Sequence, residues 1–426
     1  MSKRLQAMRG TRDILPGEVE AWQALEDAAR RFSARYGYRE IRTPYFEATE
    51  LFARGVGEST DIVRKEMYTF PDRKGRSLTL RPEGTAGVAR ALIEAGLTQP
   101  GMLHRVYYLG PMFRYDRPQA GRYRQFHQWG AEVVGSASPW ADVETILLLV
   151  DLLGTMGLAG LTVKLNSVGD ATCRPAFQQR IREILGPRRA ELCPDCQERL
   201  DKNPLRVFDC KVPSCQEIVH HLPPMLDSLC DACRAHLEQV KRGLEAAGAR
   251  YEIDPGLVRG LDYYARTAYE VHHGQLGAQS ALGGGGRYDG LIHLLGGADV
   301  PAVGFSMGVE RTLLALEEEG KTPQPESAGV FLARGAGLGD EALRLARELR
   351  RRFQVYLDLE ERGLGAQLKQ ADRLGARLAV ILGEDEVKAG ELTLKDLATG
   401  EQRRVPRAGI EEALAAALAA AGGPGR

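Results

Sequence analysis

The sequence lacks a membrane-spanning segment and a secretory signal. No uninterrupted apolar run approaches the roughly 20 residues that cross a bilayer, and the most apolar stretch, Ile146–Leu153, contains Asp151. The N-terminal residues carry charge but no apolar signal core. We therefore expect a cytoplasmic protein without a membrane partner.

The chain also lacks an excess of charge of either sign. It contains 57 Lys and Arg residues against 57 Asp and Glu residues, so its formal net charge is zero. A nucleic-acid partner is therefore not indicated by the overall charge, and any basic surface must be local. The composition, with 43% hydrophobic and 27% charged residues, is typical of a globular protein, and 426 residues predict two or three domains.

Cysteine is absent from most of the chain. All seven cysteines lie between Cys173 and Cys233, and six of them form the close pairs Cys193/Cys196, Cys210/Cys215 and Cys230/Cys233. In a cytoplasmic chain of this size, such pairs indicate free thiols or a metal site rather than disulfides. Two pairs have the spacing of zinc knuckles, and three histidines follow nearby: His220, His221 and His236. Structural zinc is one interpretation, although we favour reduced cysteines that pack in the interior.

The first three quarters of the chain contain mostly strand patterns joined by turn residues. This arrangement predicts an α+β fold, an antiparallel sheet with helices packed on one side. Helical spacing is found over Ala21–Tyr36 and Tyr45–Arg54. Strands are predicted at Leu78–Leu80, Val106–Arg114, Gln125–Val134, Leu161–Asn166, Ala268–His272 and Val303–Ser306. Residues 170–245 have a different character, with the cysteines, several prolines and two helical segments, and we interpret them as an insertion.

A linker rich in proline and polar residues, Lys321–Ala328, precedes a second pattern. Strand and helix signals alternate after it, which predicts a small α/β domain with a largely parallel sheet. The signals are strands at Val330–Ala333, Gln354–Leu357 and Leu378–Leu382, and helices at Glu341–Arg352, Gly365–Gly375 and Ile410–Ala421. We therefore expect two domains, residues 1–325 and 326–426.

Three segments carry the residue types of a ligand site. In Val258–Tyr264, Arg259 can bind phosphate or carboxylate oxygens while Tyr263 and Tyr264 shape a pocket. Alternation along Gln125–Val134 places Gln128, Gly130 and Glu132 on one face, so that an amide and a carboxylate flank a notch. Four arginines surround the preceding loop and can clamp phosphate: Arg114, Arg117, Arg122 and Arg124. The alternative interpretations are a polar turn, a solvent-facing strand and a solvated basic loop.

Three further segments are weaker signals. Glu83 and Thr85 lie in a polar turn and would accept hydrogen bonds from a small ligand. Gly283–Gly290 permits close backbone approach but matches neither a P-loop nor a dinucleotide-binding fingerprint. Val303–Arg311 reads as a strand that turns into a helix, where Arg311 could stack on a base or reach a phosphate.

Together these residues resemble the histidyl-tRNA synthetases, a family of class II aminoacyl-tRNA synthetases. The resemblance covers nearly the whole chain and begins at Arg9–Asp13. Tyr38–Phe46 resembles class II motif 1, Phe113–Gln128 motif 2 and Gly304–Arg311 motif 3. The segments that are particular to histidine enzymes are Leu257–Tyr264 and Ala281–Gly290. The C-terminal unit resembles the family's anticodon-binding domain at Gln367–Asp372 and Leu382–Glu386.

The resemblance implies a fold, an activity and partners. It implies a class II catalytic core with a helical, cysteine-containing insertion, followed by the anticodon-binding domain. It implies a histidine–tRNA ligase that activates L-histidine with ATP and Mg²⁺ and transfers it to the 3′ end of tRNA(His). Motif 1 implies a homodimer.

The resemblance also implies a role for each site residue. The histidine pocket would be lined by Glu83, Thr85, Gln128, Glu132, Tyr263 and Tyr264. Arg114 would hold the ATP α-phosphate, Arg122 would reach the terminal phosphates, and Arg311 would lie against adenine. Arg259 would sit between the amino-acid carboxylate and the α-phosphate, so Arg259 and Arg114 are the catalytic candidates, and no metal ligand is assigned.

Two alternatives belong to other functional classes. A paralogue of these enzymes is a histidine-sensing regulatory subunit of ATP phosphoribosyltransferase, which does not bind tRNA. A class II synthetase for another amino acid, such as threonine or proline, is the second. The arginines of motif 2, the Arg259 segment and the C-terminal domain argue against the first, and the two histidine-type segments argue against the second.

Overall fold

The computed structural model describes residues 4–274, 280–323 and 328–421. The chain divides into two compact units, Met1–Pro323 and Gln324–Arg426. The predicted domain limit between residues 325 and 326, and half of the predicted linker, lie outside the described residues. Among the described helices, none combines the length and apolarity that a membrane crossing requires.

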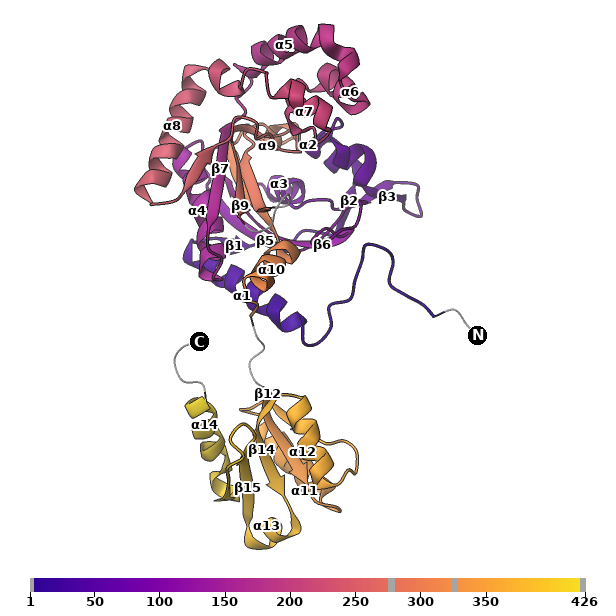
Figure 1. Ribbon diagram of the computed structural model, residues 1–426, viewed down its shortest axis with the longest axis vertical. Helices are drawn as coiled ribbons and strands as arrows, with labels where there is room; N and C mark the ends of the chain where they lie inside the picture. Colours follow the sequence, from indigo (N-terminus) through magenta and orange to yellow (C-terminus); the bar gives the residue numbers. More distant parts are fainter. Residues whose placement is uncertain (1–3, 275–279, 324–327, 422–426) are drawn as a thin grey trace. The chain divides into compact units, whose positions relative to one another are not determined.

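The first unit contains an eight-stranded sheet (Figure 1). Its strands run in the order β1 (Arg39–Glu40), β5 (His104–Phe113), β6 (Gln125–Val134), β11 (Ala302–Gly308), β10 (Ala281–Arg287), β9 (Ala265–His273), β7 (Leu161–Ser167) and β8 (Tyr251–Ile253). All pairings from β5 to β7 are antiparallel, and the short edge strands β1 and β8 pair in parallel. The prediction of an antiparallel core is confirmed, and the bounds of β6 match those expected from its alternation.

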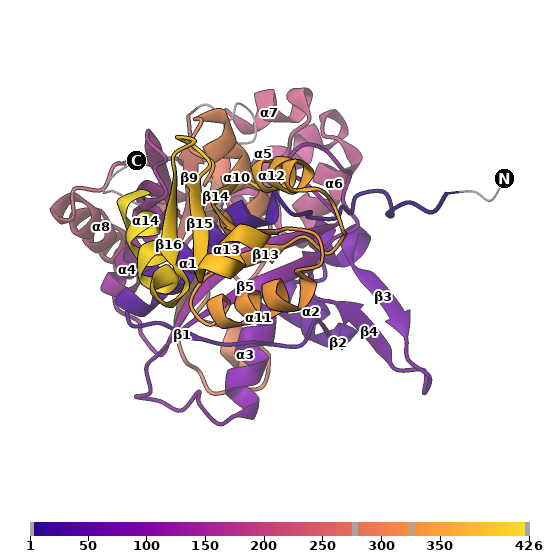
Figure 2. The same cartoon turned by 90° about the horizontal axis from the view of Figure 1, so that it is seen from below.

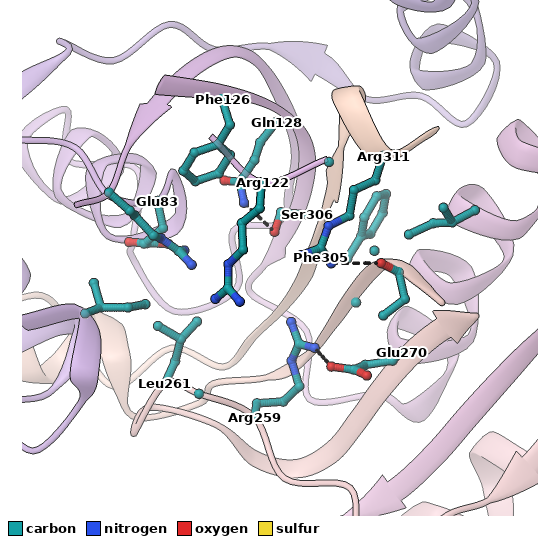
Figure 3. Close-up of a pocket in the computed structure, with 18 of the residues that line it drawn as sticks. Glu83, Arg122, Phe126, Gln128, Arg259, Leu261, Glu270, Phe305, Ser306 and Arg311 are labelled. Atoms are coloured by element: carbon teal, nitrogen blue, oxygen red, sulfur yellow. Dashed lines mark hydrogen bonds and ion pairs between the residues drawn. The ribbon is translucent and has the colours of Figure 1, made fainter. Parts of the chain in front are cut away.

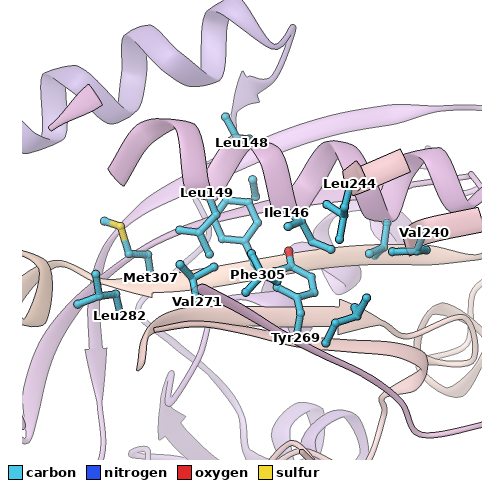
Figure 4. Close-up of a cluster of buried hydrophobic side chains, with 14 of the residues drawn as sticks. Ile146, Leu148, Leu149, Val240, Leu244, Tyr269, Val271, Leu282, Phe305 and Met307 are labelled. Carbon is cyan, nitrogen blue, oxygen red and sulfur yellow. The ribbon is translucent and has the colours of Figure 1, made fainter. Parts of the chain in front are cut away.

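Helices cover both faces of this sheet. One face packs against α1 (Val19–Arg35), α4 (Pro139–Thr155), α8 (Asp231–Ala246) and α10 (Val309–Glu318) in the main hydrophobic core. Figure 4 shows part of that core, with Ile146 and Leu149 of α4 against Tyr269 and Val271 of β9. The other face packs against α3 (Thr85–Glu94) and α9 (Leu291–Leu294). The expectation of helices on one side was therefore wrong, because Tyr108 and its neighbours also present an apolar face there.

A small antiparallel sheet adjoins the core. It consists of β2 (Phe46–Ala48), β4 (Ser77–Leu80) and β3 (Tyr68–Pro71), and Figures 1 and 2 show the β3–β4 hairpin projecting from the first unit. The helix predicted over Tyr45–Arg54 begins only at Thr49, as α2 (Thr49–Val56). Residues 46–48 are extended instead because they pair with β4.

The insertion is more helical than expected. Four helices replace the two predicted: α5 (Arg174–Leu185), α6 (Pro194–Lys202), α7 (Pro213–Val219) and α8. Helices α5, α6 and α7 are short and each has proline in its first turn, where the missing N–H costs nothing. These prolines of the insertion therefore mark helix starts.

The second unit has a mixed five-stranded sheet. Strands β13 (Val355–Leu357), β12 (Ala328–Arg334) and β14 (Ala376–Leu382) are parallel, as predicted, and α11 (Gly339–Leu349) and α12 (Leu364–Arg373) connect them. Two antiparallel strands, β15 (Glu391–Asp396) and β16 (Gln402–Pro406), extend the sheet and were not predicted. The unit also contains α13 (Glu384–Ala389) and the expected α14 (Ile410–Ala421).

A buried ion pair fixes α4 to the sheet. The Arg287 guanidinium of β10 bonds to Asp142 of α4, and neither side chain has exposed surface. Arg287 also donates to the carbonyl oxygens of Ser136 and Ser138 at 2.7 and 3.0 Å, so its hydrogen-bonding capacity is largely satisfied. His236 of α8 reaches the same aspartate, with 3.2 Å between Nε2 and Oδ1. Substitution of one partner would leave the other charge buried and unpaired. The resulting loss of stability would exceed the net stabilisation that the ion pair provides.

Substitution Gly285→Ala is expected to destabilise the first unit. A Cβ atom at Gly285 would lie 2.0 Å from the carbonyl oxygen of Gly304 in β11, and that backbone atom cannot rotate away. Overpacking of this kind costs about 1–3 kcal/mol or more. Thermal unfolding should show a lower Tm than wild type, whereas Gly290→Ala, with open space around its Cβ, should not. Equal Tm values for the two variants would contradict the proposed close packing.

Candidate active site

The first unit contains a cavity of about 340 Å³. Its lining comes from β6, β10 and β11, from the turn before α3, and from the Arg259–Tyr264 segment. Figure 3 shows Glu83 and Arg311 toward opposite sides of the cavity, with the guanidinium groups of Arg122 and Arg259 between them. Segments that are more than 200 residues apart in the chain thus form one site.

Glu83 and Thr85 lie at the start of α3. The Glu83 carboxylate accepts hydrogen bonds from the backbone N–H groups of Thr85 and Ala86 at 2.7 and 2.8 Å. These are orphan donors of the first helical turn, which favour a negative charge. Burial nevertheless raises the pKa of Glu83 above its ordinary value. The turn therefore holds a carboxyl group rigidly at the cavity wall.

Glu132 lies behind the lining and not on it. Its carboxyl group accepts a hydrogen bond from Thr85 Oγ1 at 2.7 Å and another from the Tyr288 hydroxyl. Burial raises the pKa of Glu132 to about 8, although both hydrogen bonds act in the opposite direction. Glu132 would thus reach a ligand through Thr85.

The expected notch at Gly130 is filled by a tyrosine. A Cβ atom at Gly130 would lie 2.3 Å from the hydroxyl oxygen of Tyr108 on the neighbouring strand β5. The glycine is therefore required for packing of Tyr108, and the idea that it opens a notch for a ligand was wrong. Gln128, two residues earlier, does line the cavity and donates to Ser306 Oγ at 3.3 Å.

Two tyrosines follow Arg259 on the cavity wall. The rings of Tyr263 and Tyr264 are 4.7 Å apart, and Tyr288 packs edge-on against Tyr263 at 5.5 Å. Burial raises the pKa of each phenol, so all three hydroxyls stay protonated and can donate hydrogen bonds. Aromatic faces and neutral hydroxyls suit a planar, polar ligand group.

Three arginines come from the loop between β5 and β6 and from α10. Arg114 donates to the Pro82 carbonyl at 2.8 Å, and Arg311 donates to the Ala281 carbonyl at 3.1 Å. Among the described residues, neither is within ion-pair distance of a carboxylate. Arg122 pairs with Asp116. Burial lowers the pKa of Arg114 and of Arg311, and for Arg311 the neighbouring arginines add to this effect.

Arg259 has a carboxylate partner that the sequence interpretation missed. It pairs with Glu270 of β9, whose other oxygen lies 3.1 Å from His272 Nε2. Burial by itself would raise the pKa of Glu270. The charge of Arg259 and the hydrogen bond to His272 have the larger effect and lower this pKa to about 2. Within the described residues, Arg259 Nε and Gln128 Oε1 are buried without a hydrogen-bond partner. Such groups are costly unless a ligand or water satisfies them.

The predicted site residues therefore largely meet in one cavity. Nine of the ten named candidates line it, namely Glu83, Thr85, Arg114, Arg122, Gln128, Arg259, Tyr263, Tyr264 and Arg311, with Glu132 behind them. Arg117 and Arg124 are not among the lining residues, and Arg124 stacks on Tyr115 at 3.8 Å. Glu270 and Tyr288 were missed. Glu270 is the one carboxylate in β9, and this could have pointed to it.

The three predicted cysteine pairs form two clusters in the insertion. One cluster combines two pairs, and the other adds Asp170 and Cys173 to the third pair. None of the nearby histidines belongs to either cluster in the described part of the chain.

Comparison with known proteins agrees with this geometry. The family model for histidyl-tRNA synthetase matches residues 10–312. The chain belongs to the histidyl-tRNA synthetase family. A second model, for an anticodon-binding domain, matches residues 327–417. The predicted family, the α+β class II fold and the assignment as an aminoacyl-tRNA ligase are therefore confirmed.

Curated histidyl-tRNA synthetases match the chain over nearly its full length. The histidine–tRNA ligase of Moorella thermoacetica is 53% identical over 405 residues, covering 94% of this chain and 96% of the relative. That of Desulfitobacterium hafniense is 50% identical over 413 residues, covering 96% and 97%. The apo histidyl-tRNA synthetase from S. aureus has a TM-score of 0.82 at 37% identity, covering 96% of this chain and all of that chain.

Glu132→Gln is expected to change how stability depends on pH. A buried carboxyl group with a raised pKa keeps its proton in the folded state while the unfolded state loses it, so stability falls as pH rises from about 4.5 to about 8. The glutamine variant lacks this slope. The Tm of the variant relative to wild type should therefore increase across this range, whereas the exposed Glu94→Gln should run parallel to wild type. Parallel curves for both variants would show that Glu132 ionises normally.

Proposed function

We propose that the cavity activates L-histidine with ATP and that the chain then transfers histidine to tRNA(His). The main support for this function is that one cavity has a polar end at Glu83 and a cationic end at Arg311, with Arg259 between them (Figure 3). Such a site can hold an amino acid and a triphosphate side by side. In the reaction, a histidine carboxylate oxygen attacks the α-phosphorus of ATP and pyrophosphate leaves.

The polar end is proposed to bind the histidine side chain and amino group. Glu83 and Gln128 offer hydrogen-bond acceptors. Thr85 lines the cavity and is oriented by its hydrogen bond to Glu132. Tyr263 and Tyr264 would enclose the imidazole ring. Specificity would arise because an analogue without ring nitrogens leaves buried polar groups such as Gln128 Oε1 unpaired.

The cationic end is proposed to bind the phosphates and the base. Arg114 has no carboxylate partner among the described residues and would hold the α-phosphate. Arg122 would leave its ion pair with Asp116 and bind the terminal phosphates. Arg311 would lie against adenine. Guanidinium groups suit these oxygens because they donate in a planar fork.

Arg259 is proposed to reduce the repulsion between the two reacting anions. Its guanidinium is already oriented by Glu270, so little reorganisation would accompany the reaction. Mg²⁺ would accompany ATP, and the carboxylates of Asp116 and Glu270 on the cavity lining are oxygen donors of the type that this ion prefers. When bound, Mg²⁺ would withdraw charge from the phosphate oxygens. No side-chain nucleophile is required, since positioning and charge neutralisation suffice.

The second step is proposed to need the second unit. The terminal ribose hydroxyl of tRNA(His) would attack the acyl carbon, and AMP would leave. The anticodon-binding match over residues 327–417 supports a role for this unit in holding the tRNA. Its α/β sheet, with β14 at the centre, has its own hydrophobic core and can provide a separate docking surface.

We further propose a cytoplasmic homodimer. The segment that resembles motif 1 contains β1, at the edge of the large sheet, and leaves Tyr45 and Phe46 each 54% exposed. Exposed aromatic residues beside an edge strand are suited to a protein interface.

Arg259→Ala is expected to lower histidine-dependent pyrophosphate exchange by at least about a hundredfold, because a preoriented cation at the developing charge is lost. Arg259→Lys should recover only part of this, since an ammonium group cannot form the planar fork. The exposed Arg54→Ala serves as a matched control. Exchange near the wild-type rate in Arg259→Ala would refute this role. Exchange with proline or threonine in place of histidine would refute the assigned specificity.

A chain that ends at Pro323 is expected to separate the two steps. The first unit contains every residue proposed for activation, so pyrophosphate exchange should stay near the full-length rate. Charging of tRNA(His) should fall about a hundredfold or more, equivalent to roughly 2.8 kcal/mol of binding free energy. Full charging by the shortened chain would refute the role of the second unit.

A further inference from the structure

All seven cysteines of the chain converge in two compact clusters within the insertion. In each cluster, four potential ligand atoms lie within 4.8 Å of one another. The first cluster consists of Cys193, Cys196, Cys210 and Cys215, and the second consists of Asp170, Cys173, Cys230 and Cys233. No cysteine is left over, which is unexpected if the thiols serve only as small apolar side chains.

The sulfur separations suit a single tetrahedral ion. The distance from Cys193 Sγ to Cys210 Sγ is 3.8 Å, and that from Cys173 Sγ to Cys233 Sγ is 3.9 Å. A tetrahedron with zinc–sulfur bonds of about 2.3 Å has edges of roughly 3.8 Å. A disulfide would require about 2.05 Å. An iron–sulfur cluster would need room for several atoms between the sulfurs.

Backbone groups around the first cluster support anionic sulfur. The N–H of Cys193 donates to Cys215 Sγ at 3.1 Å. Three of the four cysteines are buried, and none is bonded in a disulfide. Cys193 and Cys196 come from the first turn of α6, whereas the other two lie beyond it in the chain, so an ion would tie α6 to α7.

The second cluster has a carboxylate as its fourth ligand. Asp170 Oδ1 lies 3.6 Å from Cys173 Sγ and 3.8 Å from Cys230 Sγ. Its other oxygen is held by Arg266 at 3.4 Å, and the Thr172 N–H donates to Oδ1 at 3.0 Å. Such outer contacts orient a ligand. This cluster joins the segment that follows β7 to the first turns of α5 and α8, the first and last helices of the insertion.

We propose that the insertion holds two structural zinc ions, one in a four-cysteine site and one in a three-cysteine, one-aspartate site. Four protein ligands at each site leave no open position, which is typical of structural rather than catalytic zinc. Thiolate-rich sites favour zinc over magnesium or calcium. Apart from α8, the helices of the insertion are short, and binding of two zinc ions would increase the stability of this segment.

Both sites connect to the segment that carries the candidate active site. Arg174, next to Cys173, donates to the carbonyl oxygens of Gly169 and Tyr264. Asn203, after α6, donates to Asp262 Oδ1 at 2.8 Å. The ions would thus stabilise the residues that hold Asp262 and Tyr264 in place. The proposal of zinc does not depend on which substrates the enzyme binds.

Elemental analysis of the purified full-length protein tests this directly. After desalting without chelators, we expect about two zinc ions per chain, one for each cluster. Cys196→Ser and Cys233→Ser should each retain about one. The double variant of the exposed His220 and His221 to alanine is the matched control and should keep both. Zinc loss in the histidine control would overturn the assigned ligands.

Cobalt substitution tests the geometry even where a cysteine variant does not fold. Wild-type protein refolded or expressed with Co²⁺ should show thiolate-to-cobalt charge transfer and the intense visible bands of tetrahedral coordination. Wild-type protein that contains no zinc, gives no such bands and has seven free thiols in the folded state would overturn the proposal. Iron in place of zinc would also overturn it, and a single equivalent of zinc would overturn it for one cluster.

Discussion

The absence of side chains from Gly283 to Gly286 is the constraint on which the cavity depends. A Cβ atom at Gly284 would lie 2.8 Å from Arg259 Nη1, and one at Gly286 would lie 2.2 Å from the carbonyl oxygen of Thr267. Bare backbone in β10 therefore lets β9 and β11 approach and lets Arg259 lie across the strand toward Glu270. Glycine in a strand interior is unfavourable for the isolated strand, and here neighbouring strands compensate for it.

The electrostatics of the site follow from that packing. Arg259 and Arg122 each have a carboxylate partner, while Arg114 and Arg311 are held only by carbonyl oxygens among the described residues. Four arginines line the cavity, and the two that have no carboxylate partner among the described residues can attract an anion. At the opposite end, burial keeps Glu132 and the phenols protonated. Burial thus lowers the pKa of Arg114 and Arg311 and raises the pKa of the carboxyl and phenol groups in the same cavity.

The insertion contributes to the site indirectly. It lies between β7 and β8 in the chain, and its helices pack into the main core through residues such as Phe177, Val207 and Val240. Hydrogen bonds from Arg174 and Asn203 connect it to the backbone and side chains of the segment after Arg259. A cysteine-rich segment that appears separate in the sequence is therefore continuous with the structure that supports the ligand cavity.

Local patterns in the sequence predicted many of the helices and strands and most of the residues that line the cavity. Alternation fixed the bounds of β6, and the motifs around Arg114, Arg259 and Arg311 identified cavity residues, because hydrogen bonding and burial act at short, regular spacing. Tertiary structure alone decided that Tyr108 fills the space at Gly130, that Glu270 pairs with Arg259, and that Asp170 meets Cys233. Those contacts depend on strand order and on the path of the insertion. The residues that they join are not related by the regular spacing of a helix or a strand, so local sequence patterns do not reveal them.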